Sequence, residues 1–430
     1  MPKSRGTTAG TSVEPAAQRV AGGGLLDRRM LLGAGLTGGA AIAATATPAG
    51  AETLSVPPWM KTPGAPFVPY GQPSRHEAKI VRTITAVSGP GTGVARTPLH
   101  RLNGMITPNG LHFERSHNGV PDIDPDAHRL LIHGMLKRPL LFTLEALSRY
   151  PMESRIAFLE CAGNSGLLYA KDPMPGDAQT LHGLVSCAEW TGVRLSTLLD
   201  EAGLDPAATW MIAEGADAAA MSRSVPVSKA MGDAMIALYQ NGERIRPSNG
   251  YPMRLLLPGF EGNMNVKWLR RLKLTDTPAM TKDETSKYTL LQESGEALQF
   301  FFTIEAKSII TQPSPGLTLK GPGLYEISGL AWSGAGRIAK VDVSADGGKS
   351  WAPAALSEPV LDRAVTRFRM PWQWDGGPAV LQSRATDSTG YTQPARSQQI
   401  AQRGGRAQFH FNGIASWGVQ NSGEVRHVYA

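Results

Sequence analysis

The sequence predicts an α+β domain followed by a β-sandwich of immunoglobulin type. The chain has 430 residues, enough for two or three domains with large cores. Its 48 glycines and 32 prolines favour a chain rich in strands and loops over a helical bundle. From about residue 301, short segments of alternating polarity replace a mixture of strand-like and helix-like runs. Short strands at this spacing are typical of an antiparallel sandwich.

The first 51 residues have the features of an export leader. Residues 28 and 29 are the arginines of a twin-arginine pattern, a weakly apolar stretch covers 31–44, and residues 49–51 read Ala-Gly-Ala, a cleavage site. The alternative is a membrane anchor, but the stretch is short and Gly-rich for a spanning helix. The sequence therefore predicts export of the folded protein to the periplasm. The mature chain would begin near Glu52 and have no membrane span.

The charge of the chain argues against nucleic acid as a partner. The formal net charge is +7, and residues 1–51 carry five basic and two acidic side chains, which leaves about +4 on the remainder. That value is mild, and no block of Lys and Arg is present. A weakly positive protein could favour anionic substrates or an acidic partner.

Four segments are expected along the chain. They are the leader (1–51), an extended Pro/Gly-rich arm that wraps the surface (52–100), a first domain (101–300) and a second domain (301–430). In the first domain we expect strands at 157–159 and 254–257, a helix over 195–203 that ends at a C-cap glycine, and a short helix starting at 225–231. In the second domain we expect strands at 317–319, 324–330, 339–344 and 379–385, with turns at 346–348 and 387–390.

The most informative residue is Cys161, within the segment Phe-Leu-Glu-Cys-Ala-Gly-Asn (158–164). The chain has only two cysteines, and none lies within ligand spacing of Cys161, which excludes a zinc knuckle or a CxxC pair there. Cys161 is then a nucleophile, the single ligand of a thiolate-binding metal centre, or a buried core residue. Cys187 is interpreted as a buried structural thiol, and the two cysteines need not pair.

Further segments could supply a site, although each alone has an ordinary structural explanation. Arg115 and His117 are two residues apart, so in a strand they point to the same side, and the guanidinium could bind an oxyanion. Polar or basic residues also recur within 249–271 and in the Gly-rich loop 331–337.

Taken together and in this order, the motifs resemble the sulfite oxidase family of molybdenum enzymes, from about residue 101 to the C-terminus. The matching segments are FERSH (113–117), ECAGN (160–164), WTGVRL (190–195), NGYPMRLLLPG (249–259), NVKWLRR (265–271), AWSGAGR (331–337) and VDVSADGGKSW (341–351). The resemblance implies a sulfite-oxidase-type molybdopterin domain of α+β fold, followed by an Ig-like dimerisation domain.

The resemblance also implies roles for individual residues. Cys161 would be the single protein thiolate on molybdenum, with two more sulfurs from a molybdopterin. Arg115 would lie beside the oxo group and bind the anionic substrate, and Arg337 would reach the substrate pocket from the second domain. Asn164 would shape the Cys161 loop. The implied cofactor-binding residues are Phe113, Arg115, His117, Cys161, Asn164, Val266 and Lys267.

The chain departs from the family pattern in ways that bear on substrate. Familiar sulfite oxidases have two arginines where this chain has Ser165 and Gly166, and a tyrosine where it has Leu238. Tyr239, one residue later, should face the opposite way in a strand. The pocket is therefore expected to have lost positive charge and a phenol, and to bind free sulfite less well.

These departures favour one branch of the family. No C-x-x-C-H haem motif is present, so the electrons would pass to a separate c-type cytochrome subunit. With the twin-arginine leader, this resembles the molybdenum subunit of a sulfane dehydrogenase of a Sox sulfur-oxidation system, whose substrate is sulfur on a carrier protein. A homodimer or a heterotetramer is expected.

Three alternatives remain open. The first is a free-sulfite dehydrogenase. The second is a sulfoxide reductase, which the Cys-Ala-Gly-Asn segment disfavours. The third is an inactive assembly protein of the same fold, which an intact Cys161, Arg115 and Lys267 disfavour.

Overall fold

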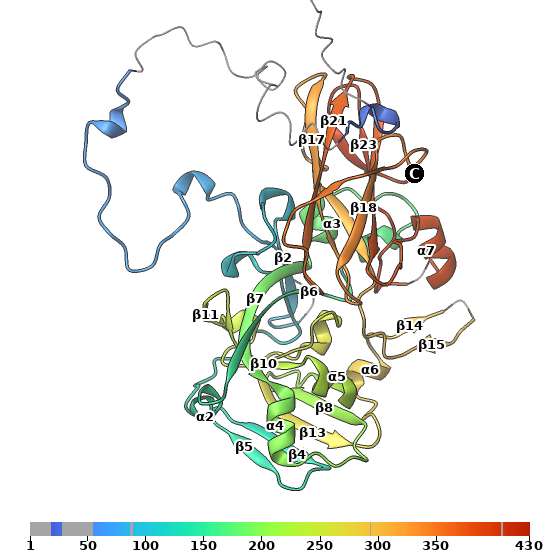
Figure 1. Ribbon diagram of the computed structural model, residues 1–430. Coiled ribbons are helices and arrows are strands. Elements are labelled where there is room, and N and C mark those ends of the chain that lie inside the picture. The colour runs from blue at the N-terminus through green and yellow to red at the C-terminus, as the bar shows by residue number, and fades with distance from the viewer. Residues whose placement is uncertain (1–18, 28–54, 87–88, 293, 406) are drawn as a thin grey trace, which may run out of the picture.

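The computed structural model describes residues 19–27, 55–86, 89–292, 294–405 and 407–430. The chain forms two stacked lobes, with the green and yellow strands below and the orange and red strands above (Figure 1). The lower lobe mixes sheets and helices and the upper lobe is a β-sandwich, which confirms the predicted fold class. Within the described ranges, no helix combines the length and apolar character needed to cross a bilayer.

Two sheets and several short helices build the lower lobe. One sheet has the order β11-β10-β7-β6, with β12 also paired to β10, and the other has the order β5-β4-β13-β8-β9. The β13–β4 pair is parallel. The strands are β4 (Leu130–Gly134), β5 (Leu140–Phe142), β6 (Met152–Glu160), β7 (Val185–Arg194), β8 (Trp210–Gly215), β9 (Ser222–Pro226), β10 (Met235–Gln240), β11 (Glu243–Arg244), β12 (Arg254–Leu256) and β13 (Leu269–Thr275). The helices are α2 (Leu144–Ser148), α4 (Leu195–Ala202), α5 (Val227–Gly232) and α6 (Lys282–Thr285).

Helix α4 forms where the sequence predicts it. Its apolar residues recur at helical spacing, and Leu195, Leu198, Leu199 and Ala202 are all buried. Gly203 ends the helix with a φ of 72°, a conformation that glycine adopts without a steric penalty. The buried face of α4 joins the main core of the lower lobe, which also includes Leu238 of β10.

Two antiparallel sheets build the upper lobe. Their orders are β16-β17-β21-β20 and β19-β18-β22-β23-β24. The strands are β16 (Lys307–Gln312), β17 (Gly323–Trp332), β18 (Ile338–Ser344), β19 (Ala352–Pro353), β20 (Ala355–Leu356), β21 (Thr366–Trp374), β22 (Ala379–Asp387), β23 (Ser416–Val419) and β24 (Val425–Val428). The core between the sheets is rich in tryptophan, with Trp372, Trp374 and Trp417 buried. The segment 317–319, expected as a strand, makes only an isolated bridge between Thr318 and Glu424.

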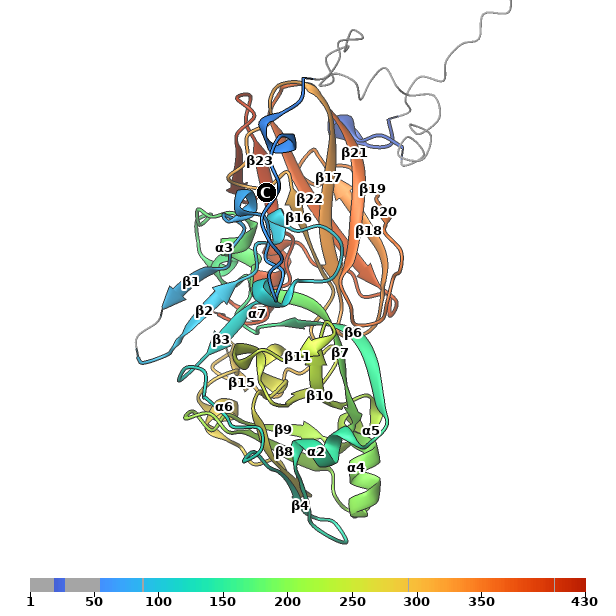
Figure 2. The same cartoon turned by 90° about the vertical axis from the view of Figure 1, so that its left-hand side faces the viewer.

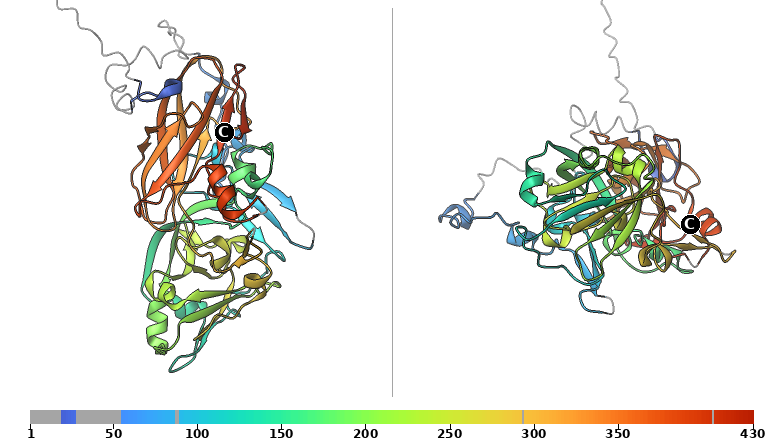
Figure 3. Two further views of the ribbon diagram at one scale, coloured as in Figure 1. Left: turned by 90° about the vertical axis from the view of Figure 1, so that its right-hand side faces the viewer. Right: turned by 90° about the horizontal axis from the view of Figure 1, so that it is seen from below.

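Three further elements lie close to the junction of the lobes. Helix α7 packs beside the sandwich near that junction (Figure 3). The junction elements are α3 (Ala178–His182), α7 (Arg396–Arg403) and the hairpin of β14 (Leu290–Leu291) and β15 (Ala297–Leu298). The described ranges also contain 3-10 turns at Gly22–Gly24, Pro58–Met60, Arg75–Glu77, Leu99–Arg101, Asn109–Leu111, Gly166–Tyr169, Pro247–Asn249 and Gly262–Met264.

The segment expected as a surface-wrapping arm divides into two parts. Its end forms β1 (Thr83–Ala86) and β2 (Gly93–Arg96), which join β3 (Glu114–Ser116) in a three-stranded sheet (Figure 2). In that sheet Val94 is paired with Arg115. The expected boundary at residue 101 therefore separates strands that pair with each other. Residues 55–79, in contrast, are largely exposed and do not wrap the surface.

Part of the predicted leader packs on the sandwich. Leu25 pairs with Trp372 of β21 and is fully buried, and the Trp372 indole donates to the carbonyl of Gly23 at 2.7 Å. The remaining predicted leader, 1–18 and 28–51, including both arginines of the twin-arginine pattern, lies outside the described residues.

Candidate active site

Cys161 sits at the end of β6, in a loop held by hydrogen bonds. Its N–H donates to the carbonyl of Leu184 at 2.9 Å, and its carbonyl accepts from the N–H of Asn164 at 2.9 Å. The Asn164 amide donates to Glu160 Oε1 at 2.8 Å and accepts from the N–H of Leu184 at 3.0 Å. Asn164 therefore ties the loop to both β6 and the segment before β7, which fixes where the thiol points.

A glycine allows another segment to reach this loop. A Cβ atom at Gly262 would lie 2.9 Å from the carbonyl oxygen of Glu160 and 3.3 Å from the Cα of Cys161. Only a residue without a side chain permits this approach without displacement. The close contact brings the segment 262–267 against the cysteine loop and closes one side of a cavity.

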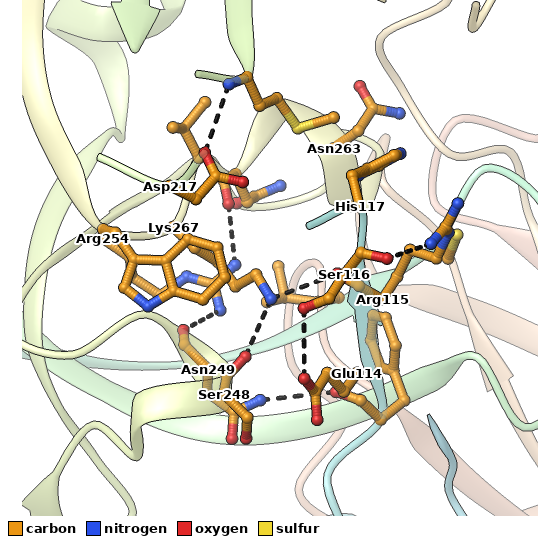
Figure 4. Close-up of a pocket in the computed structure, with 18 of the residues that line it drawn as sticks. Glu114, Arg115, Ser116, His117, Asp217, Ser248, Asn249, Arg254, Asn263 and Lys267 are labelled. Atoms are coloured by element: carbon orange, nitrogen blue, oxygen red, sulfur yellow. Dashed lines mark hydrogen bonds between the residues drawn. The ribbon is translucent and has the colours of Figure 1, made fainter. Parts of the chain in front are cut away.

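Cys161 lines a cavity of about 710 Å³, part of which is open to solvent. Figure 4 shows most of the residues that line this cavity. This volume is in the range of small-molecule and cofactor sites. Six of the predicted site residues line it: Phe113, Arg115, His117, Cys161, Val266 and Lys267. They come from β3 and its flanks, the end of β6 and the loop before β13, so the fold brings together segments more than 100 residues apart.

Burial governs the chemistry of the thiol. It raises the pKa of Cys161, while the backbone N–H of Gly163 and the charge of Arg115 act in the opposite direction. A thiol with a raised pKa is not activated as a nucleophile, and it would bind a metal only by losing its proton. In the part of the chain that the structure describes, no group of three or more His, Cys, Asp or Glu could hold a metal ion.

Strand β3 and its flank supply Arg115 and His117. Arg115 donates to the carbonyl of Gly93 on β2 at 3.2 Å and also contacts the carbonyl of Ser116. Burial, together with nearby cations such as Arg115, lowers the pKa of His117 to about 4, so this imidazole is neutral at pH 7. His117 Nε2 lies 3.0 Å from the hydroxyl of Tyr288, which also lines the cavity.

Two buried cations brace the cavity wall. Lys267 donates to the carbonyls of Ser248 at 2.9 Å and Arg115 at 3.2 Å (Figure 4). Arg254 donates to the carbonyls of Asn249 at 2.8 Å and Asn265 at 2.9 Å. Burial lowers the pKa of Lys267 to about 7 and that of Arg254 to about 9. The hydrogen-bond acceptors of Lys267 and Arg254 given above are neutral carbonyl oxygens, which do not neutralise a positive charge. Each cation can therefore still bind an anion.

Several polar atoms of the lining have no hydrogen-bond partner among the residues that the structure describes. They are His112 Nε2, Asn249 Oδ1, and both Nδ2 and Oδ1 of Asn263. Buried polar groups are nearly always hydrogen-bonded in native proteins, and unpaired ones call for an explanation. Burial lowers the pKa of His112 to about 3, so its imidazole is neutral. The lining therefore offers both donors and acceptors to a polar ligand.

The sequence reasoning missed several of these residues. Asn249, Arg254 and Asn265 fall within recognised motifs but were given no role. Asn263, within the 249–271 stretch, was given no role either, and no motif marked His112, Asp217 and Tyr288, which also line the cavity. Only His112 could have been suspected, because it directly precedes the 113–117 segment. Arg96 of β2 is close enough to Cys161 for their charges to interact, and it falls in the segment assigned to the arm.

Two predicted site residues do not line the cavity. Asn164 lies behind the cysteine loop and acts through it, as described above. Arg337, expected to reach the substrate pocket, is exposed in the turn between β17 and β18. The loop before it does contact the lower lobe, because a Cβ at Gly334 would lie 2.0 Å from the Gly259 carbonyl oxygen. The chain turns away after that contact, which leaves Arg337 facing solvent.

The residues that depart from the family pattern lie outside the cavity. Leu238 is fully buried in the core of the lower lobe, and Tyr239 packs under the guanidinium of Arg244 at 4.3 Å. Ser165 Oγ accepts from Lys307 Nζ at 2.6 Å and lies 2.7 Å from His182 Nδ1. Neither Leu238 nor Ser165 offers the cavity a phenol or a guanidinium.

Comparisons with known proteins agree with this geometry. Residues 117–282 match the family model of the oxidoreductase molybdopterin binding domain, and residues 299–412 match that of the Mo-co oxidoreductase dimerisation domain. A chain in the crystal structure of the sulfane dehydrogenase SoxCD from Paracoccus pantotrophus is 44% identical, with a TM-score of 0.85. That match covers 87% of this chain and 97% of the other.

Curated relatives are more distant and longer. The mitochondrial sulfite oxidase of Homo sapiens is 32% identical over 292 residues, which are 63% of this chain and 52% of the relative. A nitrate reductase [NAD(P)H] of Hordeum vulgare is 29% identical over 356 residues, which are 75% of this chain and 39% of the relative. The chain thus spans about half the length, or less, of these two relatives.

Proposed function

Because the chain belongs to the sulfite oxidase family of molybdopterin-binding oxidoreductases, we propose that it is a molybdenum-dependent dehydrogenase that oxidises a sulfur substrate. The observation that carries this proposal is the cavity at Cys161. A lone thiol, the guanidinium of Arg115 and several unpaired polar atoms converge there. This combination suits a cofactor and an anionic substrate bound side by side.

The residues present fit a molybdenum–molybdopterin group. Cys161 offers one soft sulfur ligand, which thiolate-binding metals prefer. The unpaired atoms of His112, Asn249 and Asn263 offer donors and acceptors that would satisfy a nitrogen-rich heterocycle. Lys267, next to the backbone of Val266, would hold the phosphate, because an amine and N–H groups suit an anion.

When bound, this group supplies two-electron redox chemistry and the transfer of a water-derived oxygen atom to the substrate sulfur. The chain supplies the surroundings of that reaction. Arg115 would hold the oxyanion of the substrate and stabilise its developing charge. His117 stays neutral at pH 7 and is oriented by the Tyr288 hydroxyl. The apolar side chains of Phe113 and Leu159 line the cavity and exclude water from it.

A sulfane sulfur carried by another protein is the substrate that we favour. The solved structure compared above, which is 44% identical to this chain, is that of a sulfane dehydrogenase. Ser165 and Leu238, which stand where arginine and tyrosine are expected for free sulfite, lie outside the cavity, and Arg115 and Arg254 are the arginines that line it. A tethered substrate brings binding energy from its carrier, so it needs fewer charged contacts at the sulfur.

The electrons would leave to a separate c-type cytochrome subunit, since the sequence has no C-x-x-C-H motif. A periplasmic location, reached in folded form by the twin-arginine route, completes the proposal. Its support is the pattern at residues 28–51.

Oxidation of free sulfite is the second candidate. It is favoured by Arg115 in the cavity. Cytochrome reduction by free sulfite, measured with the molybdenum-loaded protein and its haem partner, separates the two. Fast, saturable turnover would establish a sulfite dehydrogenase. Slow turnover with sulfite and fast turnover with a persulfide on a carrier would establish the sulfane reaction.

Replacing the metal ligand tests the enzyme itself. We expect Cys161→Ser to lower turnover by more than about a hundredfold, because the single protein ligand of the metal is lost. Cys187→Ala is the matched control, since Cys187 is buried away from the cavity and should matter only for packing. Turnover that survives in Cys161→Ser would refute the ligand assignment.

Matured wild-type protein with less than about a tenth of a metal per chain would instead support the inactive assembly protein.

A further inference from the structure

Residues 19–26, which directly precede the twin-arginine pattern, are built into the sandwich. Leu25 and Leu26 are buried, and Leu25 belongs to the main core of the upper lobe. Leu25 also pairs with Trp372 of β21. Figures 1 and 2 show this dark blue segment beside β21. Such burial is unexpected in a leader that is cut away after export, so the contact calls for a role before the cut.

The backbone of the segment is hydrogen-bonded to both sheets of the sandwich. The N–H of Leu26 donates to the carbonyl of Pro371 at 3.1 Å. The N–H of Gly22 donates to Ser350 Oγ at 2.7 Å. Pro371 belongs to β21, whereas Ser350 lies in the loop between β18 and β19 of the other sheet. The binding site therefore exists only when the two sheets are folded and packed on each other.

Three consecutive glycines, at positions 22–24, let the segment lie this close to the sandwich. A Cβ atom at Gly24 would overlap the carbonyl oxygen of Gln373. A Cβ atom at Gly23 would lie 2.7 Å from the carbonyl oxygen of Ala345. Both glycines also have a positive φ, which residues with a side chain rarely adopt. The site therefore fits a Gly-rich peptide that ends in two leucines.

We propose that this site binds the leader of the folded precursor and keeps an export receptor from the twin-arginine pattern until the segment is released. The inference rests on the proposed export of the chain. Arg28 follows Leu26 by two residues, which span at most about 7 Å. A receptor that binds Arg28 must therefore reach the surface of the sandwich itself, or bind only after residues 19–26 have left it.

Binding of the leader to the sandwich would lower the apparent affinity of the receptor. The receptor binds only the undocked fraction of the precursor, so its apparent dissociation constant is the intrinsic constant divided by that fraction. Burial of Leu25 and Leu26 stabilises the docked form and keeps the undocked fraction small. Release of the segment, which follows folding of the sandwich, would then set the rate of export.

Hydrogen exchange in the full-length chain, loaded with cofactor, measures the docking. In the wild type the amides of Gly22 and Leu26 should be protected, because each donates a hydrogen bond. In Gly24→Ala they should exchange at least about tenfold faster, since the added methyl group overlaps the Gln373 carbonyl. Gly64→Ala is the matched control, because its Cβ would have no atom within 4 Å. Equal exchange in the wild type and Gly24→Ala would overturn the proposal.

Pulse-chase labelling of the same variants in cells tests whether docking delays export. We expect the Gly24→Ala precursor to be processed at least about threefold faster than the wild type, because more of it is undocked. Ser350→Ala leaves the leader unchanged and removes the acceptor of the Gly22 N–H, so it should act in the same direction. Gly64→Ala should be processed at the wild-type rate.

Two different failures can be told apart. Faster amide exchange in Gly24→Ala with an unchanged rate of processing would refute the effect of docking on export. A wild-type chain that is neither processed nor found outside the cytoplasm would refute the proposed leader, and this inference with it.

Discussion

The position of the Cys161 thiol depends on backbone hydrogen bonds and small neighbouring residues more than on charge. Hydrogen bonds to Leu184 and Asn164 fix its loop. Burial raises its pKa, with only partial compensation by Arg115 and the Gly163 N–H. A site of this kind is prepared for a metal that arrives with its cofactor, because the metal replaces the thiol proton and its charge then stabilises the thiolate.

Tyr288 supplies the only phenol of the cavity among the described residues. The family phenol is absent at Leu238, and Tyr288 comes from a different element, after α6. Its hydroxyl contacts His117 Nε2 at 3.0 Å. We expect Tyr288→Phe to lower kcat/KM about two- to tenfold, the effect of one hydrogen bond. Steady-state kinetics at pH 7 check this.

Tyr239→Phe is the matched control for that change. Tyr239 packs under Arg244 outside the cavity, and its ring is preserved in the variant. Equal kinetics for the wild type and Tyr288→Phe would remove the role assigned to the Tyr288 hydroxyl.

Lys267 gives the protein without cofactor a pH-dependent stability. Burial lowers the pKa of Lys267 from 10.5 in the unfolded chain to about 7 in the folded one. Between these values the unfolded chain binds one more proton, so the free energy of unfolding increases as pH rises from 7 to 10.5. The increase should be on the order of a few kcal/mol. Urea unfolding of the apoprotein at pH 7 and 9.5 measures it.

The comparison variant is Lys267→Met, which keeps an unbranched side chain without the amine. We expect its stability to change less with pH than that of the wild type over this range. If both proteins show the same pH slope, the amine of Lys267 is not the titrating group.

At the scale of elements, three separate segments converge on the cysteine. Strand β3 is positioned by β2, the cysteine loop by β6, and the wall around Lys267 by the segment before β13. The 3-10 turn at Gly262–Met264 holds the last two together, because Gly262 touches the backbone of Glu160 and Cys161. The precision of the cavity therefore depends on one contact between loops.

A methyl group at that contact should open the cavity. We expect Gly262→Ala to lower the molybdenum content and to destabilise the protein by about 1 to 3 kcal/mol, since the added Cβ would lie 2.9 Å from a backbone oxygen. Metal analysis and urea unfolding provide the readouts. Gly232→Ala is the control, because its Cβ would have no atom within 4 Å. A full metal content in Gly262→Ala would show that the loops can separate without harm.

At the scale of the whole molecule, a buried ion pair joins the two lobes behind the cysteine. Lys307 of β16 donates to Glu160 Oε1 at 2.8 Å and to Ser165 Oγ at 2.6 Å. Trp332 of β17 donates to Glu160 Oε2 at 2.6 Å. The upper lobe therefore satisfies both oxygens of the carboxylate that precedes Cys161. The lobe that matches the dimerisation domain is thus connected to the cysteine loop through Glu160.

Replacing Lys307 by an uncharged residue should lower the free energy of unfolding. We expect Lys307→Met to destabilise the protein by about 3 to 5 kcal/mol, because Glu160 is left buried without its partner. Lys340→Met removes the exposed partner of Asp342, which keeps its ion pair with Arg384, and should cost less than about 1 kcal/mol. Urea unfolding compares the two. The double variant Lys307→Met, Glu160→Gln should recover part of the loss, and no recovery would exclude the unpaired charge as its cause.

The fold class and the principal motifs could be predicted from the amino-acid sequence alone. Periodicity and turn residues locate α4 and most sandwich strands, because these signals are local. The segments around residues 113–117, 161 and 266–267 were also identifiable, since the chemistry of Cys, Arg, His and Lys is visible in a linear chain. Residues 113–117, 161 and 266–267 all line the cavity.

The polar residues that face that cavity could be identified only in the folded chain. Tyr288, Asn263 and Asp217 reach it from loops without a recognisable pattern, and Arg337 turns away although its motif is present. The pairing of β1 and β2 with β3 and the contact of Lys307 with Glu160 likewise join residues distant in sequence. The physical reason is that side-chain direction and long-range pairing depend on how loops close and lobes pack, which local propensity does not specify.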